Sequence, residues 1–254
     1  REVRRAMAIK GECLEAYLGL GFLANRHRRE TEAIKYFERA RGLAGGSLYA
    51  AEALEKLRAG RGESVEFFGF DGAGLPTGWV PDQRYGVMIE AKGGQLSFSG
   101  KQKQVGGRET RFYVRQDARK FVRMEVDVIA APTGGSVCGL LLAGTRGFLE
   151  IGMFENGKLA WRMKNRGGYS APADVRDWPT GSGGAPGKVR LGIQVLDAGQ
   201  GRFRLFADGL PVKDVVVDTL AGNQGYQVGG FCRAQLDESV DVRMDNASLV
   251  TRKQ

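Results

Sequence analysis

The hydrophobic pattern of this 254-residue chain changes its period near residue 62, and this change constrains the fold more than any other feature. Before it, apolar residues recur every three or four positions, which is typical of amphipathic helices. After it, apolar and polar residues alternate, which places one face of a strand on a core and the other in water. The sequence therefore predicts a helical segment over residues 1–60 and a mainly β domain over residues 65–254.

Alternation is clearest at residues 122–128, 189–195 and 240–244, where the intervening charged residues are expected to face solvent. Asn156-Gly157 and Asp208-Gly209 each lie between two such runs, and these dipeptides supply the positive φ angles of tight hairpins. Further strand-like runs lie at 65–70, 87–90, 95–98, 110–114, 136–144 and 226–233. Many short strands with no helix between them indicate an antiparallel sandwich or barrel.

The charge and cysteine content narrow the possible chemistry. A net charge of +9 attracts nucleic acid, anionic lipid or acidic polysaccharide without choosing among them. The basic run 26–29 lacks interleaved aromatic residues, so we expect a solvated turn and no specific nucleic-acid partner. Cys13, Cys138 and Cys232 are odd in number and widely spaced, which argues against a disulfide framework or zinc. We expect Cys138 and Cys232 to be buried free thiols, with a bridge between them as the alternative.

No window approaches the apolar length of a membrane-spanning helix, so we expect no transmembrane segment in this chain. The chain begins with Arg1 inside a helical pattern, which suggests that further residues precede it. Cysteine usage is compatible with either side of a bacterial membrane. We favour the cell envelope or another extracytoplasmic location over the cytoplasm.

Two amphipathic stretches, 12–25 and 30–43, flank the polar turn and predict a helical hairpin. Tyr17-x-x-Leu20-Gly21 and the later Ala33-x-x-x-Phe37-x-x-Ala40 resemble the tetratricopeptide repeat. The resemblance covers one repeat, and it implies the C-terminal end of a longer array. It also implies a protein partner that docks on the helices.

Short motifs at both ends of the β domain resemble concanavalin-like and laminin-G-like jelly rolls. The domain opens with Phe68-Gly69-Phe70-Asp71-Gly72 and then Leu75-Pro76-Thr77-Gly78-Trp79; Gly94, Leu96 and Phe98 follow, and Val242-Arg243-Met244-Asp245-Asn246-Ala247-Ser248-Leu249 closes it. The resemblance implies pairing of the first and last strands. It also implies a possible structural calcium there, for which Asp71 and Asp245 are weak candidates because calcium needs six or more oxygen ligands. No other cofactor is expected.

The strand Glu150-Ile151-Gly152-Met153-Phe154-Glu155 resembles the Glu-x-Asp-x-x-Glu strand of jelly-roll β-glucanases. In those enzymes the outer residues are nucleophile and acid, and the central Asp tunes them. Here Gly152 replaces the Asp, and Glu155 precedes the Asn156-Gly157 turn, which predicts a hairpin end. We therefore assign no catalytic residue and keep Glu150 and Glu155 as the alternative. Jelly rolls with a similar opening also include hydrolases of keto-glycosides, a likeness that assigns no residue.

Residues 164–187 form a long Gly-, Ser- and Pro-rich stretch, which is often functional in a compact domain. Its aromatic and charged residues suit sugar rings and hydroxyls: Trp178, Tyr169, Arg166, Arg176 and Asp177. Alternatively, Trp178 packs the stretch onto the sandwich, or the stretch contacts a protein. A second candidate for an acidic partner is a basic face: Lys101, Lys103, Arg111, Arg115, Arg119 and Arg123. The alternative there is a solvated strand face with a charged edge.

Three functions remain open on the sequence. The favoured one is a non-catalytic scaffold, in which the jelly roll recognises a glycan or a partner subunit. The alternatives are a carbohydrate-active hydrolase that uses the jelly-roll cleft and a purely structural subunit of a large bacterial assembly. The single histidine, His27, and the altered carboxylate strand favour the scaffold and the structural subunit over the hydrolase, and the combination of helical repeats with a jelly roll favours the scaffold.

Overall fold

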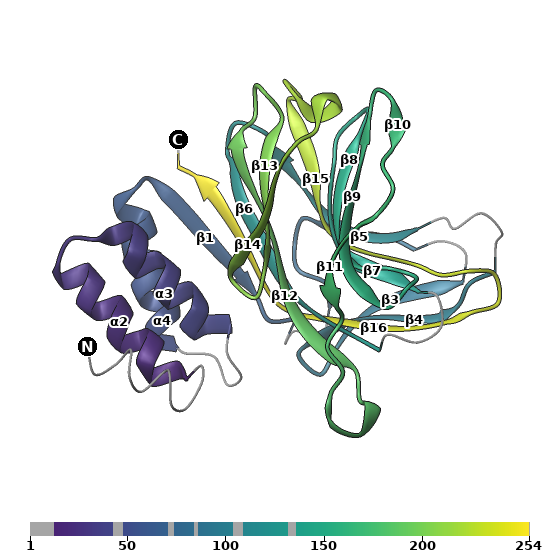
Figure 1. Cartoon of the computed structure of the whole chain (residues 1–254), viewed down its shortest axis with the longest axis horizontal. Helices are drawn as coiled ribbons and strands as arrows, with labels where there is room; N and C mark the ends of the chain where they lie inside the picture. Colours follow the sequence, from purple (N-terminus) through teal and green to yellow (C-terminus); the bar gives the residue numbers. More distant parts are fainter. Residues whose placement is uncertain are drawn as a thin grey trace. The chain divides into compact units, whose positions relative to one another are not determined.

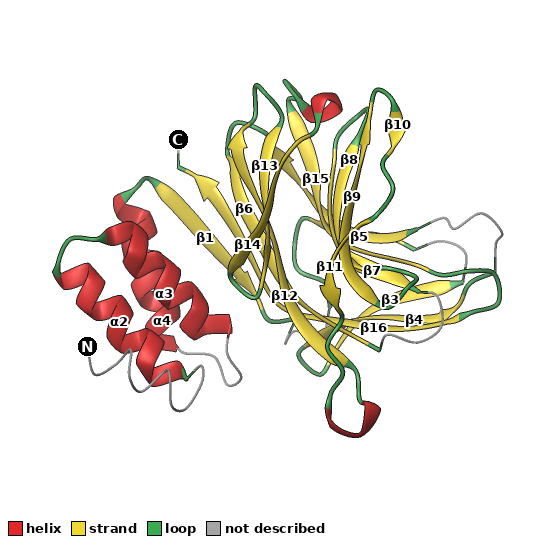
Figure 2. Ribbon diagram, viewed as in Figure 1, coloured by secondary structure: helices red, strands yellow, loops and turns green. Residues whose placement is uncertain are grey.

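The structure, a computed structural model, describes residues 13–42, 48–70, 74–83, 86–103, 109–131 and 136–253. The chain divides into two compact units, and each is described by itself (Figure 1). One unit contains Arg1–Val65 and Arg252–Gln254, and the other contains Glu66–Thr251. Mainly β structure follows a short N-terminal helical segment, as Figure 2 shows.

The helical unit contains three helices among its described residues: α2 (Leu14–Arg26), α3 (Glu30–Gly42) and α4 (Leu48–Gly60). A Cβ atom on Gly21 would lie 2.6 Å from the Phe37 ring, so glycine is required where α2 meets α3. Ala33, Phe37 and Leu54 are buried in the small core of this unit. The expected tetratricopeptide-like array is not supported. Such an array buries its helices between several stacked repeats, and only three helices are described in this unit.

Sixteen strands are described, and they form two antiparallel sheets (Figures 1 and 2). Sheet A has the spatial order β14 (Leu210–Val216), β13 (Arg202–Ala207), β12 (Gly187–Asp197), β6 (Phe121–Ala130), β16 (Ser239–Arg252), β4 (Gln95–Lys101) and β3 (Val87–Lys92). β1 (Glu63–Phe68) also pairs with β16, so the first and last strands are neighbours, as the jelly-roll resemblance predicts.

Sheet B has the spatial order β10 (Gly168–Tyr169), β9 (Lys158–Asn165), β8 (Phe148–Met153), β7 (Val137–Ala143), β15 (Gly225–Arg233), β5 (Thr110–Asp117) and β2 (Trp79–Asp82). β11 (Ala173–Asp177) pairs with the same edge of β9 as β10 does, nearer the start of that strand. Two 3₁₀ turns, η1 (Ser182–Gly184) and η2 (Asp218–Leu220), complete the described elements. The antiparallel sandwich that the alternation predicts, and the jelly roll that the resemblance of the terminal motifs implies, are therefore confirmed.

Both predicted hairpins are present. β8 pairs with β9 across Asn156-Gly157, and β13 pairs with β14 across Asp208-Gly209. Asp208 and Gly209 have φ angles of 51° and 75°, which is the left-handed pair of conformations that a tight hairpin turn needs. These turns set which residues of the paired strands lie opposite one another.

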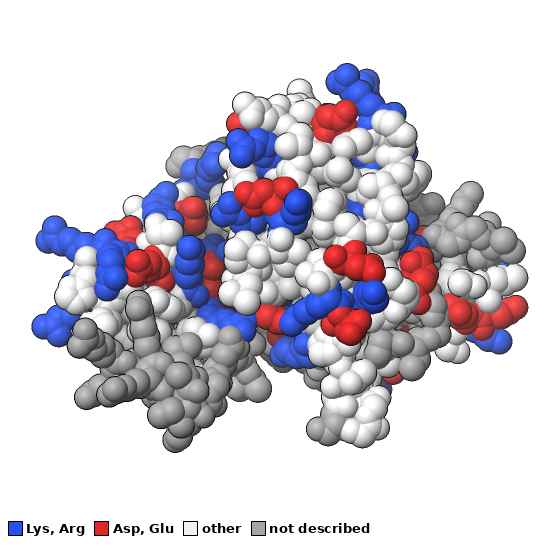
Figure 3. All heavy atoms as spheres, viewed as in Figure 1, with Lys and Arg blue, Asp and Glu red and all other residues white. Residues whose placement is uncertain are grey.

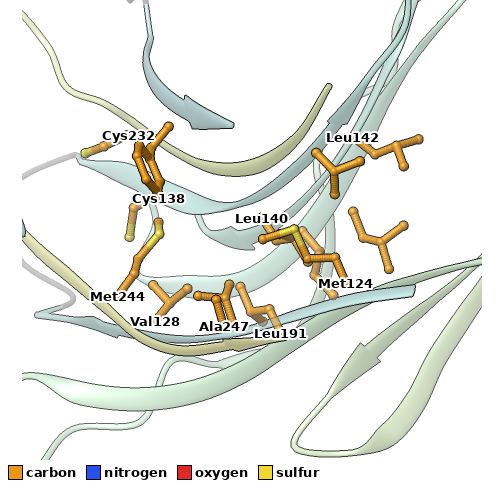
Figure 4. Close-up of a cluster of buried hydrophobic side chains, with 14 of the residues drawn as sticks. Met124, Val128, Cys138, Leu140, Leu142, Leu191, Cys232, Met244 and Ala247 are labelled. Atoms are coloured by element: carbon orange, nitrogen blue, oxygen red, sulfur yellow. The ribbon is translucent and has the colours of Figure 1, made fainter. Parts of the chain in front are cut away.

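The core lies between the two sheets, where the alternating apolar residues of both interdigitate. Figure 4 shows Cys138, Cys232 and Met244 on one side of this core and Met124 with Leu142 on the other. Cys138 and Cys232 are directly opposite each other on β7 and β15, and both are free thiols. Burial raises the pKa of the Cys138 thiol to about 12. The expectation of buried thiols at these two positions is confirmed.

The outer face of sheet A differs from the expectation that its charged residues lie in water. Arg123, Glu125 and Asp127 on β6 are buried, as is Arg190 on β12. They form an alternating chain of charges: Arg123 Nη2 lies 2.6 Å from Glu125, Arg190 lies 3.5 Å from Glu125 and 2.9 Å from Asp127, and Lys188 lies 2.8 Å from Asp127. Side chains of opposite charge on β6 and β12, which are neighbours in the sheet but distant in the sequence, thus take the place of water around each charged group.

Candidate functional site

Glu150 lies at the centre of the outer face of sheet B. On β8 the alternating residues Leu149, Ile151 and Met153 point into the sandwich core, so Glu150 points the other way. Its side chain is nevertheless 0% exposed. A second apolar cluster shares this outer face with it: Val137, Leu141, Ala143, Phe154, Ala160 and Phe231. Glu150 is therefore a carboxylate embedded in an apolar surface.

Two arginines contact the Glu150 carboxylate. The Nε–H of Arg162 donates a 2.8 Å hydrogen bond to Oε2, and Arg233 lies 3.3 Å from both carboxylate oxygens. Arg233 also lies 3.6 Å from Oε2 of Glu109, which in turn pairs with Arg111. Arg162, Glu150, Arg233, Glu109 and Arg111 thus form a chain of alternating charges. Because Arg162 is the more exposed of the two arginines on Glu150, at 21%, it covers that carboxylate from the solvent side.

Burial raises the pKa of the Glu150 carboxyl above its usual range, and the charge of Arg233 opposes this rise. The nearby charge of Glu109 raises the pKa further, and Arg162 lowers it. Two carboxyl groups thus share one arginine, and one of them has a raised pKa. Pairs of acidic groups in unequal environments of this kind are typical of acid–base catalysis.

The position of the central Asp in the β-glucanase-like strand cannot hold a side chain in this backbone. A Cβ atom on Gly152 would lie 2.0 Å from the carbonyl oxygen of Cys138 on β7. Gly152 lies directly opposite Gly139, where an added Cβ would meet the carbonyl oxygen of Ile151 at 2.2 Å. The two opposed glycines therefore let β7 and β8 approach so closely that position 152 has no room for the side chain of an Asp.

Glu155 does not join Glu150. It is exposed in the turn between β8 and β9, where the N–H of Gly157 donates to the carbonyl of Phe154. Its expected position at a hairpin end is confirmed. The second carboxyl group near Glu150 is Glu109, which directly precedes β5 and was not expected from the sequence.

The predicted ligand-binding residues of the stretch 164–187 do not share one surface. Trp178 is buried in the sandwich core, and its indole N–H donates a 3.1 Å hydrogen bond to Ala130, so it offers no face to a sugar. Arg176 pairs with Asp208, and Asp177 is exposed at the end of β11. The stretch was expected to lack regular structure, but β10 and β11 form there because they pair with β9.

Tyr169 is the residue of that stretch that lies near Glu150. Its ring is 64% exposed and lies 5.4 Å from the Phe148 ring. The Arg162 guanidinium lies 5.7 Å from the Tyr169 ring centroid, and the Lys164 ammonium lies 5.3 Å from it. Arg166 lies in the turn between β9 and β10, where its side chain is 85% exposed and 3.8 Å from Asp218. An aromatic residue and several cations therefore border the buried carboxylate.

The six residues of the expected basic face are distributed over both sheets. Lys101 belongs to β4 of sheet A, and Lys103 is exposed just after it. Arg123 is buried on the outer face of sheet A, where its guanidinium stacks 4.0 Å from the Phe206 ring. Arg111 and Arg115 lie on β5 of sheet B, and Arg119 pairs with Asp117 in the following turn. These basic residues are close in the sequence but lie on several different surfaces, because β5 and β6 belong to different sheets.

The calcium expectation stays a prediction. Asp71 lies outside the described residues, and Asp245 lies half-buried on β16, where it accepts a 2.7 Å hydrogen bond from the N–H of Asn246. Within the described ranges no group of three or more His, Cys, Asp or Glu residues is placed to hold a metal ion. None of the helices described is both long and apolar enough to cross a membrane.

Comparison with known proteins gives no match among protein-family models and none among curated proteins. Among solved structures, the chain is similar to a GlcNAcα1-4Gal-releasing endo-β-galactosidase from Clostridium perfringens, with a TM-score of 0.53 and 10% identity over 74% of this chain and 63% of that one. It is also similar to the catalytic domain of an endo-1,3-β-glucanase (laminarinase) from Thermotoga petrophila, with a TM-score of 0.53 and 8% identity over 74% of this chain and 97% of that one.

A xylan β-1,4-xylosidase from Bacillus halodurans gives a TM-score of 0.52 and 15% identity, over 74% of this chain and 39% of that one. The chain therefore spans less than two thirds of the galactosidase and of the xylosidase. At these identities the likeness establishes the fold alone. The names of these proteins nevertheless correct the expectation of a non-catalytic scaffold, because they favour the alternative of a carbohydrate-active hydrolase.

Proposed function

We propose that the sandwich unit is a glycoside hydrolase whose reacting groups lie on the outer face of sheet B, at Glu150 and Glu109. The observation that carries the proposal is the pair of carboxyl groups that share Arg233, 3.3 Å and 3.6 Å from one guanidinium nitrogen. The fold supports the proposal, since the names of the similar galactosidase and laminarinase describe enzymes that cleave glycosidic bonds. So does the position of Glu150, at the first residue of the β-glucanase-like strand.

The two carboxyl groups would divide the chemistry according to their surroundings. Glu150, whose pKa is raised by burial, would donate its proton to the glycosidic oxygen as the sugar–oxygen bond breaks. Glu109, which is 14% exposed and held by two arginines, would bond to the anomeric carbon as a carboxylate. Water would then attack that carbon and release Glu109, while the Glu150 carboxylate takes the proton of the water.

The separation of the pair favours this two-step course. One oxygen of each carboxylate contacts the same Arg233 nitrogen, so these oxygens lie no farther apart than the two contact distances together. That bound is compatible with the separation of about 5–5.5 Å between the carboxyl groups of retaining glycosidases. Arg162 and Arg233 would do the tuning that the central Asp does in β-glucanases.

A sugar ring reaches Glu150 only if a covering group moves. Arg162 is that group in this account, because it contacts both the carboxylate and the solvent. Its neighbours Phe148 and Tyr169 would then offer rings to the displaced guanidinium or to the sugar.

The test is release of reducing ends from laminarin, mixed-linkage β-glucan, xylan and β-galactan by the full chain. We expect turnover of at least one polymer, and a loss of about a hundredfold or more in both Glu150→Gln and Glu109→Gln. Glu155→Gln is the matched control, because Glu155 is exposed in the nearby turn, and it should keep wild-type turnover. No turnover by the wild type, or equal turnover in Glu150→Gln, would reject the proposal.

A further inference from the structure

We infer that the ligand of the sheet B face is an acidic polysaccharide, held along a row of six side chains that crosses the strands beside Glu150. The inference rests on the proposed function in that it names the substrate class for the same face. Residues directly opposite each other on neighbouring antiparallel strands point to the same side of a sheet. The register of sheet B therefore decides which side chains share the row.

The row runs from β10 to β5 through five strand pairs. Tyr169 lies opposite Lys164, Lys164 opposite Phe148, and Phe148 opposite Ala143. Ala143 lies opposite Gln227, which lies opposite Arg115. The next row along the strands contains Arg162 opposite Glu150. At about 4.8 Å between strands, six residues span roughly 24 Å, which accommodates several linked sugar rings.

The charges of this row are all positive. Lys164 and Arg115 are its two basic residues, and within the described part of the chain neither has a carboxylate partner. This contrasts with the neighbouring charge chain, where Glu150 and Glu109 each contact arginines. Arg115 is exposed, and Lys164 is half-buried beside the Tyr169 ring. A cation that has no carboxylate partner keeps its attraction for an anionic ligand. Figure 3 shows basic side chains at the end of the sandwich where β10 lies.

The uncharged members of the row suit a sugar. Tyr169 is 64% exposed and stands beside the Phe148 ring, which gives a flat apolar surface at one end. Gln227 is half-buried and carries an amide that can donate to and accept from hydroxyl groups. An aromatic ring beside a cation fits a sugar ring that carries a sulfate or carboxylate group.

The far end of the row opens into a hollow. Arg115 lines it together with Arg119, Asn223 and Gly225, and its volume is about 760 Å³. Asp117 also lines the hollow, but Arg119 already pairs with that carboxylate. The hollow is large enough for a sugar residue, so a polymer on the row has a place for its next unit.

The test compares two ligands that differ in charge but share one backbone. Binding of the full chain to laminarin and to laminarin sulfate is measured by isothermal titration calorimetry at low salt. We expect the sulfated polymer to bind at least tenfold more tightly. Lys164→Gln and Arg115→Gln should each weaken that binding by up to about fivefold, the effect of one exposed charge pair. Tyr169→Ala should weaken binding of both polymers. Lys164→Arg keeps the positive charge and should therefore bind laminarin sulfate as tightly as the wild type does.

Lys213→Gln is the matched control, because it removes one exposed charge from β14 of the other sheet. Equal affinity for the two polymers would overturn the inference, and so would a loss in Lys213→Gln as large as in Lys164→Gln. Tighter binding of a single-stranded oligonucleotide of equal charge would also overturn it. Selective binding without hydrolysis rejects the proposed function alone, whereas hydrolysis of laminarin without preference for charge rejects this inference alone.

Discussion

Glu150 and Arg162 are direct cross-strand partners, and the Nε–H of Arg162 donates a 2.8 Å hydrogen bond to Oε2 of Glu150. The Asn156-Gly157 turn between their strands sets this register. The partnership holds a fully buried carboxylate against two guanidinium groups, with Arg233 as the second. The protonation of Glu150 therefore links the stability of the fold to the proposed chemistry.

The first prediction concerns the pH dependence of stability. The pKa of Glu150 is raised in the folded state, so the folded chain keeps a proton that the unfolded chain loses above a pKa near 4.5. Unfolding then releases a proton, and this contribution to stability falls as pH rises through the folded-state pKa. In urea unfolding, the wild type should lose stability relative to Glu150→Gln as the pH rises from the ordinary carboxyl pKa through the raised folded-state pKa. A relative gain by the wild type would mean that the arginines hold the carboxylate ionised.

The second prediction concerns the close approach of β7 and β8. In Gly152→Ala the new Cβ would meet a backbone carbonyl at 2.0 Å, which no side-chain rotation relieves. The variant should lose at least the roughly 1–3 kcal/mol of an overpacked core, measured by urea unfolding. Gly167→Ala is the control, because no atom lies within 4 Å of its added Cβ, and it should change stability by less than about 0.5 kcal/mol. Equal effects would show that the two strands separate readily.

Sequence reasoning was strongest where local rules act. The alternation of apolar residues and the two Gly-containing turns predicted the strands and hairpins. A two-residue turn at Asn156-Gly157 would place Met163 opposite Glu150, but the loop has three residues, 155–157, and Arg162 lies there instead. Arg233 could not be predicted in the same way, because it lies 83 positions from Glu150 and reaches it only through the order of strands in sheet B. The same limit applies to Glu109.

The failures have a common physical cause. Arg123, Glu125 and Asp127 were expected in water because they alternate with apolar residues. In the folded chain Arg190 from β12 pairs with Glu125 and Asp127, and Arg123 pairs with Glu125. Trp178 was a candidate for sugar binding, and the alternative, that it packs the stretch onto the sandwich, is the one that the structure bears out. The pairing of β11 with β9 directs the chain so that its indole reaches Ala130 in the core.

The third prediction tests the buried charge chain on sheet A. Asp127→Ala leaves Arg190 and Lys188 without the carboxylate that lies 2.9 Å and 2.8 Å from them. Because Arg190 is buried, we expect a loss of about 3–5 kcal/mol in the free energy of unfolding. Asp214→Ala breaks an exposed pair with Arg204 and should cost less than about 1 kcal/mol. A loss below about 1 kcal/mol in Asp127→Ala would show that water replaces the carboxylate.

The fourth prediction concerns thiol reactivity. Cys138 and Cys232 are buried, and burial raises the pKa of both thiols, to about 12 for Cys138. Thiolates are the reactive form, so a thiol reagent at pH 8 should label Cys13 in the folded chain and all three cysteines after unfolding. The number of labels is read by intact mass. Rapid labelling of three cysteines under native conditions would contradict the buried placement.

The most direct test of the proposed hydrolase is the anomeric configuration of the first product, followed by proton NMR as the full chain degrades a β-linked polymer. Glu150 and Glu109 lie close enough through Arg233 for the two-step mechanism, so the account predicts a β-configured product that converts slowly to the α anomer. A product that is initially α would contradict the assigned pair of carboxylates. If no neutral or acidic β-linked polymer gives any product, the hydrolase itself is contradicted.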